Sequence, residues 1–317
     1  MNRISRTNMV RSGAFRGAAD LLPMFQPDSV AVVGASDDET KYGHKVLRNI
    51  IEGGFEGAIY PVNPRAETVM GLNSYPSLKD VPASPDLTCI VIPSESVYHT
   101  VENAIEAGSR SLVIISAGFG ETGEDGMKRQ LDVGALCRAH GLPAVGPNCM
   151  GICRFSHHLC ATMETLRSTP GNVSFISQSG TYGISTLNYG LRLGVAFSTF
   201  ISSGNEEVTR FADYLEYLGQ DEETRVIMGY IEGLRDAEKF RRVVSDVTRR
   251  KPVVVMKFGR TNKGSMAAAS HTGALAGSHS IYAAMFRQCG VIEVTRTQDL
   301  LNVAIALSTQ PPLKGPG

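Results

Sequence analysis

Short apolar runs alternate with longer amphipathic stretches along the whole chain. In the first half the apolar runs lie at residues 29–33, 58–62, 87–92, 111–116 and 143–145. Stretches with helical periodicity separate them, at about residues 44–51, 96–107 and 126–140. Short apolar runs that end at glycine, proline or asparagine predict buried strands. Their alternation with helices predicts a parallel sheet.

The second half repeats this alternation. Strands are expected at residues 173–177, 196–202, 225–231, 252–257 and 291–294, and helices from 182 and at about 206–218, 237–249, 280–289 and 298–307. We therefore predict an α/β protein with two doubly wound parallel-sheet domains. The expected divisions are a basic arm at residues 1–20, domains at 21–155 and 160–309, and a proline-rich hinge or tail at 310–317.

Composition narrows the class of protein. The 317 residues are 42% hydrophobic and 20% charged with zero net charge, which is typical of a globular protein and gives no sign of nucleic-acid binding. No apolar run is long enough to span a bilayer. Six cysteines without a CxxC pair favour a reducing compartment, so we expect a cytoplasmic protein. The arginines before Asp20 also fit a mitochondrial transit peptide, but we favour a simple basic arm.

Ligands of such sheets bind where the carboxyl ends of the strands meet the helices. The first turn is Gly-Ala-Ser rather than GxGxxG, and Asn63-Pro64 stands where an NAD site would carry an acid. With cations such as Lys41 nearby, this edge of the sheet suits a ligand that carries more phosphate than NAD does. From spacing alone, nucleotide binding in general is a safer prediction than coenzyme A binding. The candidate cofactor-binding residues are Gly34, Ser36, Lys41, Asn63, Pro64, Pro93, Ser116, Ala117, Gly118, Phe119 and Asn148.

The second domain offers three kinds of candidate chemistry. Ser179, Gly180 and Thr181 stand at a strand-to-helix turn, which predicts either an anion site or a plain helix cap. Glu232 ends a strand, where it is either a solvent-facing acid or a group that orients an imidazole. His271 stands among small residues that allow a phosphate to approach it closely, and imidazole can form a covalent intermediate.

Several motifs together resemble one family. Residues 32–36 (VVGAS), 60–64 (YPVNP), 116–121 (SAGFGE) and 146–151 (GPNCMG) resemble the CoA-binding domain of the NDP-forming acyl-CoA synthetases, which include succinyl-CoA synthetase and ADP-forming acetyl-CoA synthetases. Residues 176–180 (ISQSG), 230–233 (YIEG) and 270–277 (SHTGALAG) resemble their ligase domain. The resemblance runs from about Leu21 to Leu307. It implies a Rossmann-like CoA-binding domain followed by a flavodoxin-like ligase domain.

The resemblance also implies a mechanism. Acyl-CoA and phosphate exchange for an acyl phosphate and CoA, and His271 then takes the phosphoryl group and delivers it to ADP or GDP. Glu232 matches the family's acid that holds the histidine, and Ser179, Gly180 and Thr181 match its phosphate-binding helix terminus. We favour ADP and a short carboxylic acid.

The chain shows no ATP-grasp nucleotide site, so the resemblance implies the layout of an α-type subunit. A separate ATP-grasp β-type subunit would hold the nucleotide and Mg²⁺ in a hetero-oligomer.

Other interpretations remain open at this stage. The segment with Cys149, Cys153, His157, His158 and Cys160 has irregular spacing, and we expect no metal there. A CoA-binding regulatory module without turnover is one alternative function, although such a module need not keep both His271 and Glu232. An NAD-dependent oxidoreductase is a second, which the missing GxGxxG and the missing acid oppose.

Overall fold

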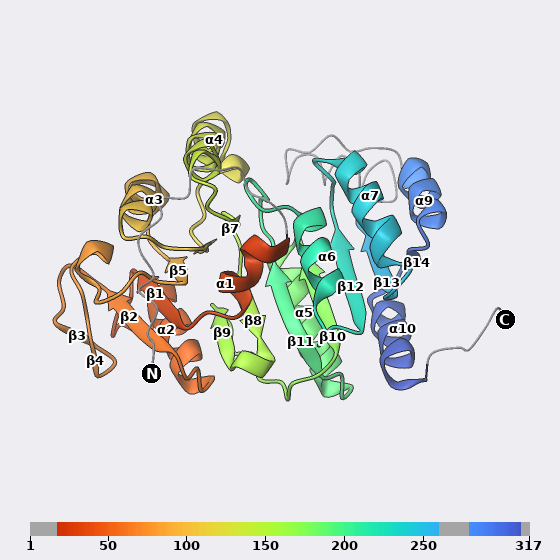
Figure 1. The fold of residues 1–317 in the computed structure, drawn as a ribbon, viewed down its shortest axis with the longest axis horizontal. Coiled ribbons are helices and arrows are strands. Elements are labelled where there is room, and N and C mark those ends of the chain that lie inside the picture. The colour runs from red at the N-terminus through yellow and green to blue at the C-terminus, as the bar shows by residue number, and fades with distance from the viewer. Residues whose placement is uncertain (1–17, 260–278, 312–317) are drawn as a thin grey trace, which may run out of the picture.

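The first sheet is five-stranded and entirely parallel. The computed structural model describes residues 18–259 and 279–311. The strand order is β2-β1-β5-β6-β7. Helix α2 (Tyr42–Glu52) covers one face, and α3 (Val97–Glu106) and α4 (Glu124–Ala139) cover the other (Figure 1). The strands are β1 (Ser29–Val33), β2 (Ala58–Val62), β5 (Leu87–Ile90), β6 (Leu112–Ile114) and β7 (Ala144–Val145).

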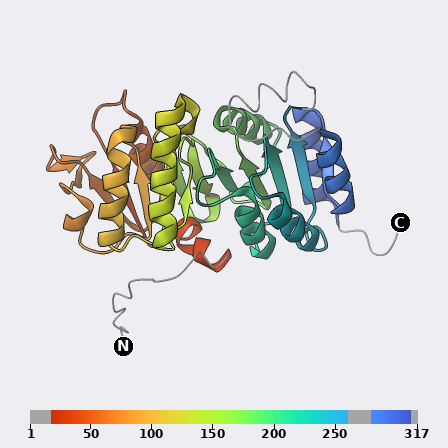
Figure 2. The same ribbon diagram turned by 90° about the horizontal axis from the view of Figure 1, so that it is seen from above.

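The second sheet has the order β14-β13-β12-β10-β11-β8-β9, and its first five strands are parallel. Figure 2 shows helices on both of its faces. Helices α5 (Gly180–Arg192) and α10 (Thr297–Thr309) share one apolar core, and α6 (Phe211–Gln220), α7 (Ala237–Val247) and α9 (His279–Gln288) share the other. The parallel strands are β10 (Val173–Ser177), β11 (Phe197–Ser202), β12 (Val226–Ile231), β13 (Val253–Lys257) and β14 (Ile292–Val294). The predicted fold class of two doubly wound domains is confirmed.

Two hairpins were not predicted. Strands β3 (Thr68–Val69) and β4 (Leu72–Asn73) form a small separate sheet. Strands β8 (Gly151–Arg154) and β9 (Leu159–Thr162) are antiparallel, and β8 pairs with β11 at the edge of the second sheet. The boundary expected at residue 155 places β8 in the first domain, whereas its hydrogen bonds join it to the second. Short strands buried on both faces lack the alternation that would have indicated them.

One predicted helix start is wrong. The helix expected from Glu206 begins at Phe211, as α6. Glu206 has a φ of 53°, which is incompatible with a right-handed helix.

The two domains share extensive contacts. The short 3-10 helix at Ala18–Leu21 and α1 (Leu22–Phe25) lie against α6, and the rings of Phe25 and Tyr217 stack at 4.6 Å. From the first domain, Asn49 Nδ2 donates a hydrogen bond to the carbonyl of Thr162 in β9 at 2.8 Å. These contacts hold the carboxyl edges of the two sheets against each other. No helix in the described part of the chain is both long and apolar enough to cross a bilayer.

Candidate functional site

A cavity of about 580 Å³ opens where the carboxyl edges of the two sheets meet. Loops after β1, β5, β6 and β7 form its first-domain side, and loops after β10, β11 and β12 form its second-domain side. The cavity therefore lies at the edge where the alternation of strands and helices predicts a ligand.

Six of the predicted cofactor-binding residues line the cavity: Gly34, Lys41, Pro93, Ser116, Ala117 and Asn148. Gly34 has a φ of +92°, and a Cβ there would lie 2.2 Å from the carbonyl oxygen of Val91, so only glycine fits. The Lys41 side chain is 63% exposed and supplies positive charge at the rim. The hydroxyl of Ser116 accepts a hydrogen bond from the backbone N–H of Ile92 at 3.1 Å, which joins two of the lining loops.

The other five predicted cofactor-binding residues do not line the cavity. The hydroxyl of Ser36 accepts a hydrogen bond from the N–H of Asp38 at 3.1 Å, and Asn63 Nδ2 donates to the carbonyl of Ala35 at 2.8 Å. Both side chains therefore shape the loop after β1. The remaining three are Pro64, which is exposed, Gly118, which has a φ of +101°, and Phe119, which is fully buried in the core under α3 and α4.

On the second-domain side, the amino terminus of α5 opens into the cavity. Ser179 is the N-cap residue, and its hydroxyl accepts a 3.4 Å hydrogen bond from the N–H of Tyr182. Ser179, Gly180 and Thr181 all line the cavity. The structure shows the helix cap, and the amino-terminal end of α5 lies at the cavity, where an anion site stays a prediction.

Glu232 follows β12 and is one of the lining residues, with only 7% of its surface exposed. It is therefore not a solvent-facing acid. The amide side chain of Gln178 holds the backbone at this point: its Oε1 accepts from the N–H groups of Glu232 at 2.6 Å and Gly233 at 3.0 Å. On the other side, Lys257 Nζ donates to the carbonyl of Glu232 at 2.8 Å. Burial lowers the pKa of Lys257, while the charge of Glu232 opposes that change.

The sequence analysis missed Asn205, Glu206 and Arg235, which also line the cavity. Glu206 is 3% exposed, and burial raises the pKa of its carboxyl to about 7, although hydrogen bonds from Ser203 and Gln178 oppose the rise. Asn205 Nδ2 donates to Glu121 Oε2 and to Gln130 Oε1, both at 2.8 Å. Asn205 and Glu206 follow the strand predicted at residues 196–202, and Arg235 follows the strand predicted at 225–231, so their positions at the carboxyl edge were the signal that could have identified them.

The next residue, Glu207, points away from the cavity and joins the two domains. Its carboxylate accepts hydrogen bonds from Arg138 at 2.9 Å and from Gln130 at 3.0 Å, both on α4, and forms an ion pair with Arg235 at 3.4 Å. The two neighbouring glutamates therefore have different surroundings: Glu207 is paired with cations, whereas Glu206 lines the cavity.

His271, the predicted phosphoryl carrier, lies outside the described residues. The strand that precedes it in the chain, β13, ends at Lys257, beside the backbone of Glu232. The chain therefore leaves β13 next to the cavity.

The cysteine and histidine segment lies in and around the β8–β9 hairpin. Cys153 and Cys160 face each other across it with their sulfur atoms 3.4 Å apart. Cys149 Sγ is 3.4 Å from the carbonyl of Ile114, and burial raises the pKa of this thiol to about 12. Within the described ranges, no three or more His, Cys, Asp or Glu side chains form a group that could hold a metal.

Comparison with known proteins agrees with this arrangement. A family model described as "CoA binding domain" matches residues 28–154, and one described as "Succinyl-CoA ligase like flavodoxin domain" matches residues 170–307. Fold and cavity together define a CoA-binding domain joined to a ligase-type flavodoxin-like domain.

Individual relatives narrow the class further. The alpha subunit of ADP-forming acetate–CoA ligase II of Pyrococcus furiosus is 43% identical over 292 residues, which cover 92% of this chain and 63% of that protein. The ADP-forming 4-hydroxybutyrate–CoA ligase of Nitrosopumilus maritimus is 37% identical over 91% of this chain and 42% of its own length.

A solved structure agrees with them. The dinucleotide-forming acetyl-coenzyme A synthetase 1 of Ca. Korarchaeum cryptofilum, in complex with phosphate and ADP, superposes with a TM-score of 0.90 at 38% identity, over 93% of this chain and 64% of that one. The chain belongs to the NDP-forming acyl-CoA synthetase superfamily. It spans less than two thirds of the length of these relatives.

Proposed function

We propose that this chain acts as the α-type part of an NDP-forming acid–CoA ligase. The reaction would convert acyl-CoA, phosphate and NDP to a carboxylic acid, CoA and NTP, and would be reversible. The observation that carries this proposal is the cavity that joins a CoA-binding edge to a helix amino terminus and a buried acid. Such an arrangement would bring a thioester and a phosphate within reach of each other.

Each side of the cavity has a part in the proposed reaction. CoA would lie along the first-domain loops, with Lys41 near its phosphates and Gly34 allowing close approach of the backbone. Inorganic phosphate would bind at the amino terminus of α5, where Ser179, Gly180 and Thr181 line the cavity. Phosphate oxygen would attack the acyl carbonyl, the bond to sulfur would break, and CoA would leave as the thiol after it takes up a proton.

The acyl phosphate would then pass its phosphoryl group to a nitrogen of His271 and release the carboxylate. Glu232 would hold the imidazole in position. The phosphohistidine would carry the group to ADP or GDP bound, with Mg²⁺, on an ATP-grasp β-type partner. The alpha-subunit naming of the P. furiosus relative supports a partner, and the complex of the Korarchaeum synthetase with ADP supports that nucleotide.

Relatives named for acetate and for 4-hydroxybutyrate are 43% and 37% identical to this chain, so we propose a short carboxylic acid without naming one. A cytoplasmic location remains a prediction from composition.

The first experiment is a calorimetric titration of the chain with CoA, with NADH as the control. We expect CoA to bind in the micromolar range and NADH not to bind. Binding of NADH without CoA would contradict the proposal and favour an oxidoreductase.

The phosphorylation step needs a second experiment. His271→Ala should abolish phosphate transfer from ATP to this chain in the presence of a β-type partner, while CoA affinity stays within about twofold because His271 is not among the predicted CoA-binding residues. Unchanged phosphorylation in this variant would exclude His271 as the carrier.

A further inference from the structure

The loop after β6 forms part of the first-domain side of the cavity. Its residues Ser116 and Ala117 line the cavity, and Gly118 follows them with a φ of +101°. Residues 116–118 lie outside the helices and strands, so regular secondary structure does not fix their peptide groups. The side chains that bind this backbone therefore decide where this part of the cavity wall lies.

The backbone of Gly118 is bound on both sides. Glu121 Oε1 accepts hydrogen bonds from the N–H of Gly118 at 2.7 Å and from the N–H of Phe119 at 3.1 Å. Arg129, on α4, donates through Nη2 to the carbonyl of Gly118 at 3.1 Å. Hydrogen bonds to charged groups are stronger than those between neutral groups, so Glu121 and Arg129 together hold this backbone.

The second oxygen of the Glu121 carboxylate binds the other domain. Asn205, on the loop after β11, donates from Nδ2 to Glu121 Oε2 at 2.8 Å. Asn205 itself lines the cavity, and its backbone N–H donates to the carbonyl of Pro147 at 2.9 Å. One carboxylate therefore joins the loop after β6 to a loop of the second domain.

The orientation of the Asn205 amide follows from the groups around it. Its Nδ2 also donates to Gln130 Oε1 at 2.8 Å, and Gln130 Nε2 in turn donates to the carboxylate of Glu207 at 3.0 Å. Ionised carboxylates only accept hydrogen bonds, so Glu121 and Glu207 must each face an amide nitrogen. The Asn205 oxygen is left to accept from Asn148 Nδ2, at 3.3 Å. Every bond in this series therefore pairs a donor with an acceptor.

The charge state of Glu121 suits this task. Burial raises the pKa of its carboxyl, but hydrogen bonds from Asn205 and from the N–H groups of Phe119 and Gly118 outweigh burial, and the pKa is lowered overall. The carboxyl is therefore ionised at neutral pH, which leaves both of its oxygens free to accept.

We infer that Glu121 is a positioning residue: its carboxylate holds the loop of residues 116–119 at the CoA side of the cavity and, through Asn205, fixes that loop against the second domain. The inference deepens the proposed function and rests on it for the identity of the ligand, CoA. Glu121 does not line the cavity, so it acts through the backbone of Gly118 and Phe119.

Amide hydrogen exchange of the Gly118 N–H, measured by NMR on the full chain, tests what holds the loop. In Glu121→Ala, exchange should be about tenfold faster, the change expected from loss of a hydrogen bond to a charged acceptor. Glu124→Ala is the matched control, because Glu124 is exposed and lies three residues further on, in the first turn of α4. Wild-type exchange in a folded Glu121→Ala variant would overturn the inference.

Two milder variants cover the case in which Glu121→Ala does not fold. Glu121→Gln keeps an oxygen for the two N–H groups, but its nitrogen would face Asn205 Nδ2, donor against donor. Asn205→Ala removes the same bond from the other side, so each variant should speed exchange of the Gly118 N–H by only about threefold. The double variant should be no faster than either single one, since both remove one shared bond. Wild-type exchange in both single variants, or effects that add in the double variant, would overturn the link to the second domain.

Ligand binding adds a readout that general loss of structure would not produce. In calorimetric titration, Glu121→Ala should raise the Kd for CoA by about tenfold and Glu121→Gln by about threefold. Phosphorylation of this chain from ATP, with a β-type partner, should stay within about twofold of wild type in both variants, because that step does not use the CoA loop.

Equal loss of CoA binding and of phosphorylation would overturn the positioning role, as would unchanged CoA affinity in Glu121→Ala. If the wild-type chain bound no CoA, the proposed function would fail, while exchange of the Gly118 N–H would still decide what holds the loop.

Discussion

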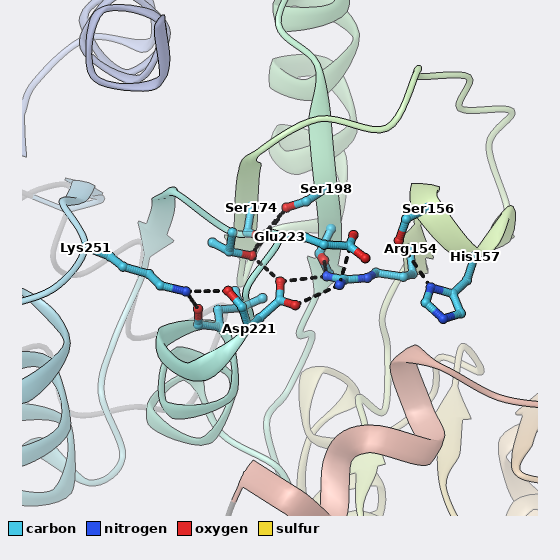
Figure 3. A network of polar contacts seen from close by, with 11 residues as sticks. Arg154, Ser156, His157, Ser174, Ser198, Asp221, Glu223 and Lys251 are labelled. Carbon is cyan, nitrogen blue, oxygen red and sulfur yellow. Dashed lines mark hydrogen bonds and ion pairs between the residues drawn. The ribbon is translucent and has the colours of Figure 1, made fainter. Parts of the chain in front are cut away.

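The two edges of the second sheet bury charge in different ways. At the amino edge, Arg154 is completely buried and its guanidinium binds Asp221 through two nitrogens at 2.7 and 2.8 Å. The guanidinium also donates to the hydroxyl of Thr199 at 2.7 Å. It forms an ion pair with Glu223 at 3.0 Å (Figure 3). Burial raises the pKa of Asp221, but hydrogen bonds from Arg154 and Thr224 and the charge of Arg154 outweigh it, so the pKa is lowered overall.

At the carboxyl edge, Glu206 is also buried, but its hydrogen-bond partner Ser203 is neutral. Its pKa is raised to about 7, in the opposite direction to that of Asp221. The difference shows that burial alone does not determine the state of a carboxyl; the charge of its partners decides the sign. The Arg154 cluster fastens the β8–β9 hairpin to the sheet, whereas the Glu206 cluster shapes a cavity.

The largest effect is expected from breaking the amino-edge cluster. Arg154→Met should lower the free energy of unfolding by about 3–5 kcal/mol, because Asp221 would remain buried without its cation. Urea unfolding measures this, with Arg250→Met as the control, since the ion pair of Arg250 with Asp246 is exposed and should contribute less than about 1 kcal/mol. CoA affinity should not change in folded Arg154→Met. Wild-type stability in this variant would mean that the cluster does not fasten the hairpin.

The contributions of the two clusters to stability should change with pH in opposite directions, because the pKa of Glu206 is raised and that of Asp221 is lowered. Between pH 4.5 and about 7, Glu206 keeps its proton in the folded chain but loses it in the unfolded chain. Its contribution to stability is therefore present at low pH and falls by about 3 kcal/mol as the pH rises through this window. Glu206→Gln should lack this loss, so its stability relative to wild type should increase from pH 5 to pH 8. A constant difference between the two unfolding curves would contradict the raised pKa.

Substitution of one neutral hydrogen-bond partner in each cluster should lower the free energy of unfolding by a smaller amount, which should be similar for the two clusters. Thr199→Val and Ser203→Ala each remove one buried hydrogen bond, and each should cost about 1 kcal/mol by urea unfolding. Only Ser203→Ala should also lower turnover with the partner subunit, because Thr199 lies at the edge away from the cavity. Equal turnover in both variants would remove the functional distinction between the clusters.

Much of the architecture could be predicted from the sequence. Buried strands such as β1 and β12 are near-continuous apolar runs, and turns such as the one at Gly34 mark their ends. The hairpin β8–β9 could not be predicted, because four-residue strands buried on both faces carry no period. The start of α6 was misplaced, since a left-handed Glu206 leaves no signal in the sequence.

The candidate site, like the fold, could be predicted from the sequence only in part. Strand-end residues such as Gly34, Ser179 and Glu232 line the cavity as predicted, because the carboxyl edge of a parallel sheet can be located from chain order alone. Ser36, Asn63 and Phe119 were assigned to the ligand by the same rule, although their side chains turn into the loop or the core. Chain order gives the edge on which a residue lies but not the direction of its side chain.

The sequence by itself determined the order of strands and helices, the two parallel sheets and the edge at which ligands bind, because hydrophobic periodicity and turn chemistry are local. Only the tertiary structure decided which carboxyls are paired. Asp221 binds Arg154 across 67 residues, whereas Glu206 accepts a hydrogen bond from the neutral hydroxyl of Ser203 and is buried among loops that follow several different strands. These distant contacts set the charge of each buried acid, since electrostatic energy depends on separation in space and on solvent exclusion.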